Sequence, residues 1–514
     1  SNQATRRAAM RGLCLLVLAL LAAAAPRVDG AGAVTGGGVS QILSGTVNSL
    51  LSCIGQSIEP KPLTEIKAQL HVDKARLEVI ANAMASEMQS GLNRNSDSSL
   101  KMLPSHLTGS PNGQEKGDFL ALDLGGTNFR VLKVTLQGDG KYAVDAGKFK
   151  VEESTMTGPG KDLFAFIAQK IKERVPEAVD APEPLPMGFT FSFPVEQPTL
   201  DSGTLVHWTK GFTCSGVEGQ DVVAMLKKAI ADEKLNIKVT ALVNDTPGTM
   251  LAGAYTDPSV CAGLILGTGT NLCYLEKVAR APKLQATSAV HKLPSVVTWN
   301  QSPHLGGSLH HIINMEWGNF GAGPSHDALP WSAYDAIVDK KSPNPGAQLF
   351  EKMISGMYLG EIARLAVTDL IAKDACFQGQ APKVFLTPGE FNTELMAFIE
   401  GSSSASQIQE RLKQHGVAEA SQRDCAVLKS VCTAVSTRAA RISAAGIAAI
   451  ARRIGRVSDC NVAVDGTVFL KYPHFSERMS AALREMLGKG SGVRFTTASD
   501  GSGVGAALAA ATVV

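Results

Sequence analysis

The stretch Phe119-Leu120-Ala121-Leu122-Asp123-Leu124-Gly125-Gly126-Thr127-Asn128-Phe129-Arg130-Val131-Leu132-Lys133-Val134 joins two apolar, partly alternating runs through an Asp-x-Gly-Gly-Thr-Asn core. This pattern predicts a strand, a tight glycine turn and a second strand. P-loops and dinucleotide fingerprints place their glycines at the start of a helix, and the sequence contains no G-x-x-x-x-G-K-[ST] motif. The backbone N–H groups of such a turn form a nest that suits a phosphate, but an ordinary β-turn explains this segment alone equally well.

A second segment changes that balance. Ala262-Gly263-Leu264-Ile265-Leu266-Gly267-Thr268-Gly269-Thr270-Asn271-Leu272-Cys273-Tyr274-Leu275 repeats the arrangement of an apolar strand, a glycine-rich turn with Thr and Asn, and another apolar strand. Two such hairpins in one chain indicate an internally duplicated ATPase core with one phosphate nest in each half.

The composition is that of an ordinary globular protein. The chain has 514 residues, enough for two large lobes or about three domains, and 44% of them are hydrophobic and 19% charged. The net charge is +2, of which the first thirty residues supply +3, so the remainder carries −1. This near-neutral remainder shows no basic footprint and no aromatic-basic interleaving, which argues against a nucleic-acid partner.

The nine cysteines are scattered along the chain and form no C-x-x-C pair. Their odd number and spacing predict buried free thiols in a reducing compartment rather than a disulfide framework. For the same reason we do not expect a structural zinc site.

The N-terminal segment differs from the rest of the chain. Residues 12–25 are an unbroken apolar run of fourteen residues, preceded by arginines and followed by Pro26 and Arg27. The run is shorter than the about 20 residues of a membrane-spanning helix. It is consistent with a signal peptide, a transit peptide or a membrane anchor, and residues 31–38 form a flexible linker by composition.

Hydrophobic periodicity outlines the remaining elements. It predicts helices over residues 64–88, 161–175, 226–231 and 428–454, and strands over 187–194, 239–243 and 462–468. Residues 350–362 are expected to form one helix with a buried stripe of Phe350, Met353, Ile354, Met357 and Ile362. Residues 281–307 lack periodicity and contain three prolines, which indicates a long surface excursion. Residues 499–506 open a C-terminal helix whose glycines are expected to let a flat group lie against the backbone.

Three titratable side chains invite a catalytic interpretation. Asp245 follows a predicted buried strand, so it is either the N-cap of the next helix, which the segment alone favours, or a general base for phosphoryl transfer. Glu351 is sufficiently explained by a favourable position in the first turn of its helix. His207 has no Ser or Cys nucleophile motif beside it and is interpreted as a structural or solvated histidine.

Six segments together resemble the hexokinase family. They are Leu122-Asp123-Leu124-Gly125-Gly126-Thr127-Asn128-Phe129-Arg130, Phe189-Thr190-Phe191-Ser192-Phe193-Pro194, Val243-Asn244-Asp245-Thr246, Gly267-Thr268-Gly269-Thr270-Asn271, Asn314-Met315-Glu316-Trp317-Gly318 and Asp500-Gly501-Ser502-Gly503. Residues 350–362, 438–446 and 503–506 are most similar to plant and green-algal hexokinases. The chain departs from the family at Pro247, where valine is commoner, and in the long excursion at 281–307.

The resemblance implies roles for individual residues. Asp245 is similar to the family's catalytic base, which takes the proton of the sugar 6-hydroxyl. The positions that match sugar-binding residues are Ser192, Thr209, Lys210, Asn244, Asn271, Glu316 and Glu351. The positions that match ATP-binding residues are Asp123, Gly125, Gly126, Thr127, Asn128, Arg130, Thr268, Gly269, Asp465, Gly466, Thr467, Gly501, Ser502 and Gly503. Mg²⁺ is expected to be held by the ATP phosphates and water, with no direct protein ligand and with Asp123 nearby.

As a whole, the resemblance implies a two-lobed α/β protein with the actin-like ATPase (ribonuclease H-like) fold. The expected division is a leader and linker at residues 1–44, a small-lobe region at 45–243 and a large-lobe region at 244–510. The implied activity is that of an ATP-dependent hexokinase, which phosphorylates glucose, and also fructose or mannose, at the 6-hydroxyl in the first step of glycolysis.

We expect a monomer that acts inside the cell, in the cytosol or at the cytosolic face of the mitochondrial outer membrane. Residues 12–25 would provide the membrane association, and plastid import is the alternative. Two other functions stay open, namely a non-catalytic glucose sensor on the same fold and an ATP-driven chaperone or filament of the actin-like class. The presence of every expected chemical residue argues against the sensor, and the sugar-side residues would have no purpose in a chaperone.

Overall fold

The computed structural model describes residues 59–93, 96–107, 111–125, 128–285, 310–498 and 500–513. The chain divides into residues 1–59 and residues 60–514, and all elements below belong to the second unit. The expectations for the leader, the linker and most of the excursion at 281–307 lie outside the described residues. No helix of the described ranges is long and apolar enough to cross a membrane.

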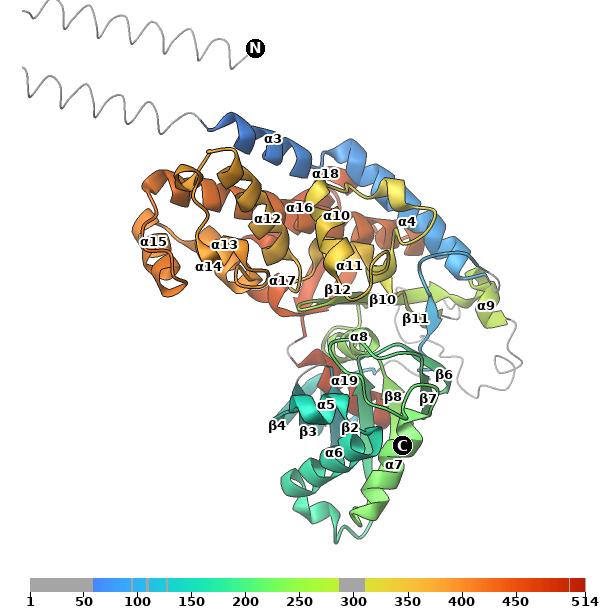
Figure 1. Ribbon diagram of the computed structural model, residues 1–514. Coiled ribbons are helices and arrows are strands. Elements are labelled where there is room, and N and C mark those ends of the chain that lie inside the picture. The colour runs from blue at the N-terminus through green and yellow to red at the C-terminus, as the bar shows by residue number, and fades with distance from the viewer. Residues whose placement is uncertain are drawn as a thin grey trace, which may run out of the picture. The chain divides into compact units, whose positions relative to one another are not determined.

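The first predicted hairpin is confirmed and lies in a five-stranded sheet of order β4-β3-β2-β5-β8 (Figure 1). β2 (Lys116–Leu124) and β3 (Asn128–Gly138) are antiparallel, and β4 (Lys141–Lys150) continues beside β3. β5 (Leu185–Phe191) and β8 (Ile237–Val243) run parallel to β2. The carboxyl ends of three parallel strands therefore meet at one edge of the sheet, followed by Gly125, Ser192 and Asn244.

Alternation along β2 divides its side chains between two cores. Leu120, Leu122 and Leu124 join the core formed with α6 (Gly160–Arg174) and α7 (Val222–Asp232). Phe119 and Ala121 join the other core, since successive side chains of a strand point to opposite faces. We call this sheet and its helices the small lobe, which also contains α5 (Glu153–Thr157), β6 (Val195–Thr199) and β7 (Ser202–Leu205).

The second predicted hairpin is confirmed as β9 (Val260–Leu266) and β10 (Thr270–Lys277). It lies in a six-stranded sheet of order β1-β11-β10-β9-β12-β13, which we call, with its helices, the large lobe. The other strands are β1 (Leu103–Pro104), β11 (His310–Asn314), β12 (Asn461–Asp465) and β13 (Arg494–Thr497). The helices include α3 (Lys61–Leu70), α4 (Lys74–Gly91), α9 (Pro282–Gln285), α10 (Ala333–Lys341), α13 (Lys383–Leu386), α14 (Thr393–Gly401), α15 (Ala405–Gln414), α16 (Gln422–Ile454), α17 (Thr467–Lys471) and α18 (Phe475–Leu487).

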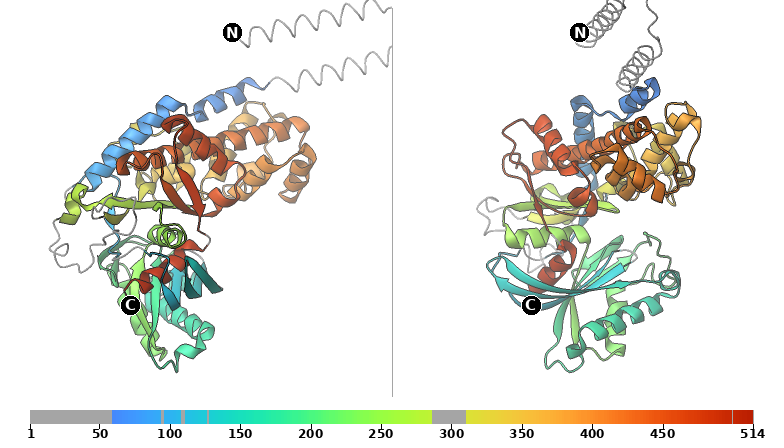
Figure 2. Two further views of the ribbon diagram at one scale, coloured as in Figure 1. Left: turned by 180° about the vertical axis from the view of Figure 1, so that it is seen from behind. Right: turned by 90° about the vertical axis from the view of Figure 1, so that its left-hand side faces the viewer.

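Two helices lie between the sheets (Figures 1 and 2). α19 (Gly501–Ala511) packs on β2 and β5, α8 (Asp245–Thr256) packs on β9, and the two helices pack against each other. A Cβ on Gly505 would lie 1.9 Å from the Gly248 carbonyl oxygen, and a Cβ on Gly503 would lie 2.7 Å from Leu132 Cδ2. Close helix packing thus leaves no room for a side chain at these glycines, and the expected contact with a flat group stays a prediction.

Residues 350–362 form two helices, so the prediction of a single helix is wrong. α11 (Leu349–Ile354) ends before Ser355, and α12 (Leu359–Ala372) begins after Tyr358. In the break, the N–H groups of Gly356 and Met357 donate to the carbonyl oxygens of Gly267 (2.7 Å) and Thr268 (3.0 Å). Met357 is 52% exposed, which corrects its place in the buried stripe, whereas the four other members are buried as predicted: Phe350, Met353, Ile354 and Ile362.

Both lobes draw on elements from each side of residue 244. β1 pairs with β11 and α4 packs on α16, whereas α19 packs under the sheet of the small lobe. The lobes are therefore discontinuous in sequence, and the division at residues 243 and 244 stays a prediction. All seven cysteines of the described ranges are buried free thiols, in agreement with the expectation from their spacing.

Candidate active site

Asp245 is the first residue of α8 and comes directly after Asn244 at the carboxyl end of β8. Asn244 is the N-cap, because its side-chain oxygen accepts a hydrogen bond from Thr246 N at 3.3 Å. The interpretation of Asp245 as the cap is therefore wrong. Asp245 Oδ1 is buried and finds no hydrogen-bond partner among the described residues. This oxygen is available to a proton or hydroxyl of a ligand.

Three acids lie close enough to influence one another. Burial raises the pKa of Asp245, Lys210 lowers it, and the Asp123 carboxylate raises it again. Burial also raises the pKa values of Glu316 and Glu351, and the charge of Asp245 adds to both shifts. Repelling, partly buried acids are expensive to maintain in a folded protein and are typical of functional sites.

A chain of amide side chains orients Glu316, which follows β11 in a left-handed conformation with φ of 54°. Asn271 Nδ2 and Asn314 Nδ2 both donate to Glu316 Oε1, at 2.9 and 2.8 Å. Asn271 Nδ2 also lies 2.8 Å from Asn314 Oδ1. Asn314 is absent from the predicted site residues. Its position two residues before Glu316, on the strand that pairs with β10, is the signal that could have identified it.

Glu351 is fixed by the turn of the second hairpin. Its Oε2 accepts a hydrogen bond from Thr270 N at 2.9 Å. Gly269 permits this approach, because a Cβ there would lie 2.9 Å from the same carboxylate oxygen. Glu351 does lie in the first turn of α11, but its carboxylate joins the site, so the helix start does not fully explain it.

The small lobe contributes Ser192 and Lys210. Ser192 follows β5, and its backbone N–H donates to Leu124 O at 3.1 Å. Lys210 Nζ donates to Ser192 O at 2.9 Å and lies 5.6 Å from the ring centroid of Phe193. Thr209 precedes it and is half-buried, whereas His207 is exposed, in agreement with a solvated histidine.

The first hairpin is tied to the start of α19 by charged and polar contacts. Arg130 Nε donates to Asp123 Oδ2 at 3.1 Å, and another guanidinium nitrogen of Arg130 forms an ion pair with Asp500. Ser502 Oγ donates to Asp123 Oδ2 at 2.8 Å. Asn128 begins β3 beside this cluster, whereas Gly126 and Thr127 lie outside the described residues. Arg130 thus already has two carboxylate partners in the protein.

The second glycine turn packs against the end of β12. Gly466 has φ of 119°, and a Cβ there would lie 2.4 Å from the Leu266 carbonyl oxygen. Burial raises the pKa of Asp465, and Arg130 lowers it. Thr268 and Thr467 are exposed at this place. β9 and β12 are parallel neighbours, so their carboxyl ends lie side by side. They bring together five of the predicted ATP-binding residues, namely Thr268, Gly269, Asp465, Gly466 and Thr467.

A cavity of about 440 Å³ borders Asn244, Asn314 and Glu316. Its wall also includes His106 and Phe193, and its volume is in the range of small-molecule pockets. Within the described ranges, no group of three His, Cys, Asp or Glu side chains is placed to hold a metal ion. The cavity wall is partly apolar, as at Phe193, and Asn244, Asn314 and Glu316 supply polar contacts for a small ligand.

Comparisons with known proteins agree with this arrangement. Two family models described as hexokinase match residues 62–255 and 261–512. Hexokinase-1 of Arabidopsis thaliana is 41% identical over 460 residues, which cover 85% of this chain and 88% of that protein. Hexokinase-3 of Rattus norvegicus is 41% identical over 453 residues, and the chain spans only 46% of its length. A solved hexokinase from Schistosoma mansoni, complexed with glucose, is 35% identical with a TM-score of 0.77 and covers 88% of this chain and 98% of its own.

Proposed function

The chain belongs to the hexokinase family, and we propose that it phosphorylates a hexose at the 6-hydroxyl with Asp245 as the catalytic base. This ATP-dependent reaction is the first step of glycolysis. The observation that carries the assignment of the base is the buried Asp245 Oδ1, which lacks a partner at the start of α8. Oδ1 takes the proton of the attacking hydroxyl, which raises the nucleophilicity of that oxygen toward the γ-phosphorus of ATP.

The sugar is held by Ser192, Thr209, Lys210, Asn244, Asn271, Glu316 and Glu351. The support for this set is the amide chain that orients Glu316 and the hydrogen bond that orients Glu351. Acceptors fixed in this way match the hydroxyl groups of a hexose, and a sugar without one hydroxyl would leave a buried acceptor unpaired. Glucose is the proposed preferred substrate, with fructose and mannose as further ones.

ATP is held by the two glycine turns and by the residues at the ends of β2, β9 and β12 and the start of α19. The proposed contacts are Asp123, Gly125, Gly126, Thr127, Asn128, Arg130, Thr268, Gly269, Asp465, Gly466, Thr467, Gly501, Ser502 and Gly503. Because the Asp123 carboxylate already accepts bonds from Arg130 and Ser502, it is poorly suited as a metal ligand. We propose that Mg²⁺ enters with ATP, bound to its phosphates and water.

Release of ADP tests this function directly. Purified protein given ATP and Mg²⁺ is expected to release ADP only when glucose is added, as followed by a coupled assay. Glucose binding without turnover, measured by calorimetry, would favour a non-catalytic sensor. ADP release that does not depend on the sugar would favour another ATPase of this fold.

Acidification is expected to lower kcat/KM for glucose. Asp245 is an effective base only when ionised, and burial raises its pKa above the ordinary value of 3.8, so activity is lost as the pH falls through this raised pKa. Lys210 lowers the pKa of Asp245, so Lys210→Met should move the acid limb of the pH profile to higher pH, whereas Lys210→Arg should not. Identical acid limbs in the two variants would contradict the assignment.

Removal of the Asn314 side chain is expected to weaken sugar binding. Asn314→Leu deletes one bond to Glu316 and the acceptor for Asn271, and a bond to a charged group contributes about 1.5–3 kcal/mol. We expect the KM for glucose to rise about 10–100-fold with the KM for ATP unchanged, as measured by initial rates. Asn236→Leu is the matched control, because the Asn236 side chain donates to the Ala181 carbonyl in the small lobe, away from the site residues. A sugar KM near the wild-type value in Asn314→Leu would remove the positioning role.

We propose that the protein acts inside the cell as a monomer, in the cytosol or at the cytosolic face of the mitochondrial outer membrane. Residues 12–25 would supply the membrane contact, and import into plastids is the alternative. Free buried thiols and the need for ATP support an intracellular place of action. Imaging of a C-terminal fluorescent fusion, with and without residues 1–30, separates these locations, and secretion of the fusion would contradict all of them.

A further inference from the structure

Cys261 and Cys460 form a buried pair of thiols in the large lobe, with 3.3 Å between their sulfur atoms. The pairing register explains how they meet. β9 and β12 pair Val260 with Asn461 but Ala262 with Val462, which leaves Cys261 as an extra residue on β9. An extra residue of this kind is a β-bulge, which changes the direction of a side chain. The bulge brings one sulfur beside the cysteine that precedes the neighbouring strand.

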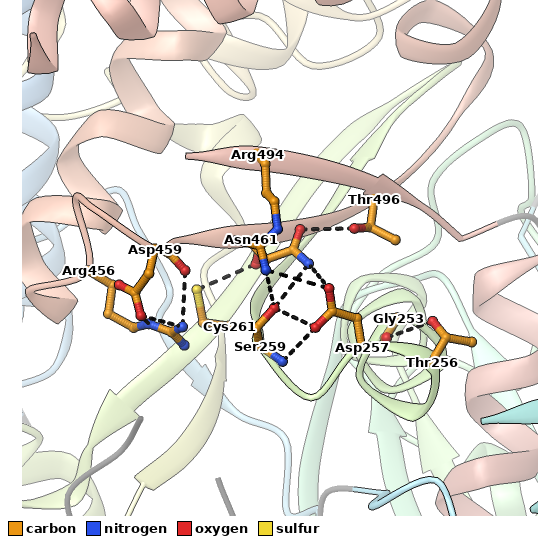
Figure 3. A network of polar contacts seen from close by, with 10 residues as sticks. All are labelled: Gly253, Thr256, Asp257, Ser259, Cys261, Arg456, Asp459, Asn461, Arg494 and Thr496. Carbon is orange, nitrogen blue, oxygen red and sulfur yellow. Dashed lines mark hydrogen bonds and ion pairs between the residues drawn. The ribbon is translucent and has the colours of Figure 1, made fainter. Parts of the chain in front are cut away.

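A polar network holds both strands at this bulge (Figure 3). Asn461 Nδ2 donates to Asp257 Oδ2 at 2.8 Å, and Thr496 Oγ1 donates to Asn461 Oδ1 at 3.0 Å. The Cys261 thiol donates to the Asn461 carbonyl oxygen at 3.4 Å. These contacts connect the turn before β9 with β12 and β13. The two sulfurs therefore lie close together in a part of the sheet that hydrogen bonds hold in place.

The two thiols have different acidities. The hydrogen bond with Cys460 lowers the pKa of Cys261 against the opposing effect of burial, and the charge of Arg456 lowers it further. The same hydrogen bond and burial raise the pKa of Cys460 well above its usual value. Since the thiolate is the nucleophilic form of cysteine, Cys261 is the thiol of this pair that reacts first.

A small cavity is lined by Cys261, the cysteine of this pair whose pKa is lowered. Its volume is about 10 Å³, and it is bordered by Cys261, Glu276 and Arg456, among others. This is about the space of one water-sized probe, so bulky reagents are excluded. The Arg456 guanidinium, which is ion-paired with Asp459, lowers the pKa of Cys261 and lines the same small space, where it can donate to a small oxygen-containing oxidant.

We propose that Cys261 and Cys460 are an oxidation site for hydrogen peroxide, with Cys261 as the reacting thiol and Cys460 as the resolving thiol. The Cys261 thiolate attacks one oxygen of the peroxide, the O–O bond breaks, and a sulfenic acid forms while the released hydroxide takes a proton to become water. Cys460 sulfur then attacks Cys261 sulfur, an S–S bond forms, and the hydroxyl leaves with the Cys460 proton as water. Two thiols and one peroxide thus become one disulfide and two waters.

Peptide mapping of the full chain tests the proposal. After treatment with hydrogen peroxide, free thiols are alkylated under unfolding conditions and the protein is digested without a reductant. We expect a pair of peptides linked through Cys261 and Cys460, which dithiothreitol separates. Glutathione disulfide, which is too bulky for the cavity, should produce less of this link. Wild-type protein in which both thiols remain fully alkylated after peroxide would overturn the proposal.

Variants separate the two roles. Cys460→Ser should leave a sulfenic acid on Cys261 that dimedone captures when the protein is unfolded in its presence, whereas Cys261→Ser should give no adduct on Cys460. The matched control is Cys273→Ser, because Cys273 is equally buried in the adjacent strand and burial raises its pKa. This control should form the linked peptides as the wild type does. In Cys460→Ser, a dimedone adduct at Cys261 no more abundant than at Cys273 would also overturn the proposal.

Discussion

Asp245→Asn is expected to lower kcat by about 10²–10⁴-fold, with little change in the KM for ATP. Asparagine has the size of aspartate but cannot accept the hydroxyl proton. The helix should remain intact, because its cap is Asn244 and not Asp245. The ATP contacts proposed above lie on the glycine turns and β-strand ends, so their geometry does not depend on the replaced carboxylate. The loss should therefore be confined to the chemical step.

Single-turnover measurements with glucose separate this step from binding and product release. Asp221→Asn is the matched control, since Asp221 also stands at a helix start, where its side chain caps α7 by accepting from Val223 N and Ala224 N. Asparagine caps helices as well as aspartate does, so this variant should keep the wild-type kcat. A wild-type rate of phosphoryl transfer in Asp245→Asn would exclude Asp245 as the base.

Asp335→Asn is expected to destabilise the protein by about 3–5 kcal/mol, because it leaves the Arg438 charge buried without a counter-ion. The Arg438 and Asp335 side chains are 0% and 1% exposed. Arg438 Nη1 and Nη2 donate to Asp335 Oδ2 and Oδ1 at 2.6 and 2.7 Å. Arg438 Nε has no partner in the described part of the chain, so no other carboxylate compensates for the loss.

Urea unfolding followed by circular dichroism measures this effect as a lower midpoint with an unchanged slope. Combined Asp335→Leu and Arg438→Met should recover part of the stability, because the pair no longer carries a buried charge, whereas Ser332 N and Oγ lose their Asp335 acceptor at the start of α10. Asp232→Asn is the control, since its ion pair with Lys228 is exposed and should contribute less than about 1 kcal/mol. If Asp335→Asn and Asp232→Asn had the same midpoint, the buried pair would not have the stabilising role described.

Both hairpins and the main strands of each lobe were predictable, because their signal is local. Alternating apolar residues interrupted by glycine turns specify strand pairs, as at Gly125 and Gly269, without any knowledge of distant partners. The helices over residues 61–91 and 422–454 follow from periodicity in the same way. The family resemblance added the fold and the reaction, which periodicity alone does not specify.

The errors arose where distant segments compete with local preference. Apolar spacing favours one helix over residues 350–362, but the backbone of Gly356 instead donates to Gly267. The glycines near Gly505 were interpreted only through a ligand, whereas the structure adds a packing reason, because the Gly248 carbonyl occupies the space that a side chain would need. Asn314 was missed because its role depends on its contacts with Asn271 and Glu316. Asn271 is distant in the sequence, so its contact with Asn314 forms only in the folded protein.

Local sequence was therefore sufficient for the strands and the turns, since these depend on spacing and side-chain chemistry, whereas the choice of site acids and amides came from the resemblance to the family. Tertiary structure alone decided what those side chains contact. In the folded protein, Asn244 is the helix cap and Asp245 Oδ1 has no hydrogen-bond partner among the described residues. Arg130 contacts the carboxylates of Asp123 and Asp500. Protonation, orientation and access of a buried group depend on the charges and donors around it, and these are brought together only when the two sheets enclose α8 and α19.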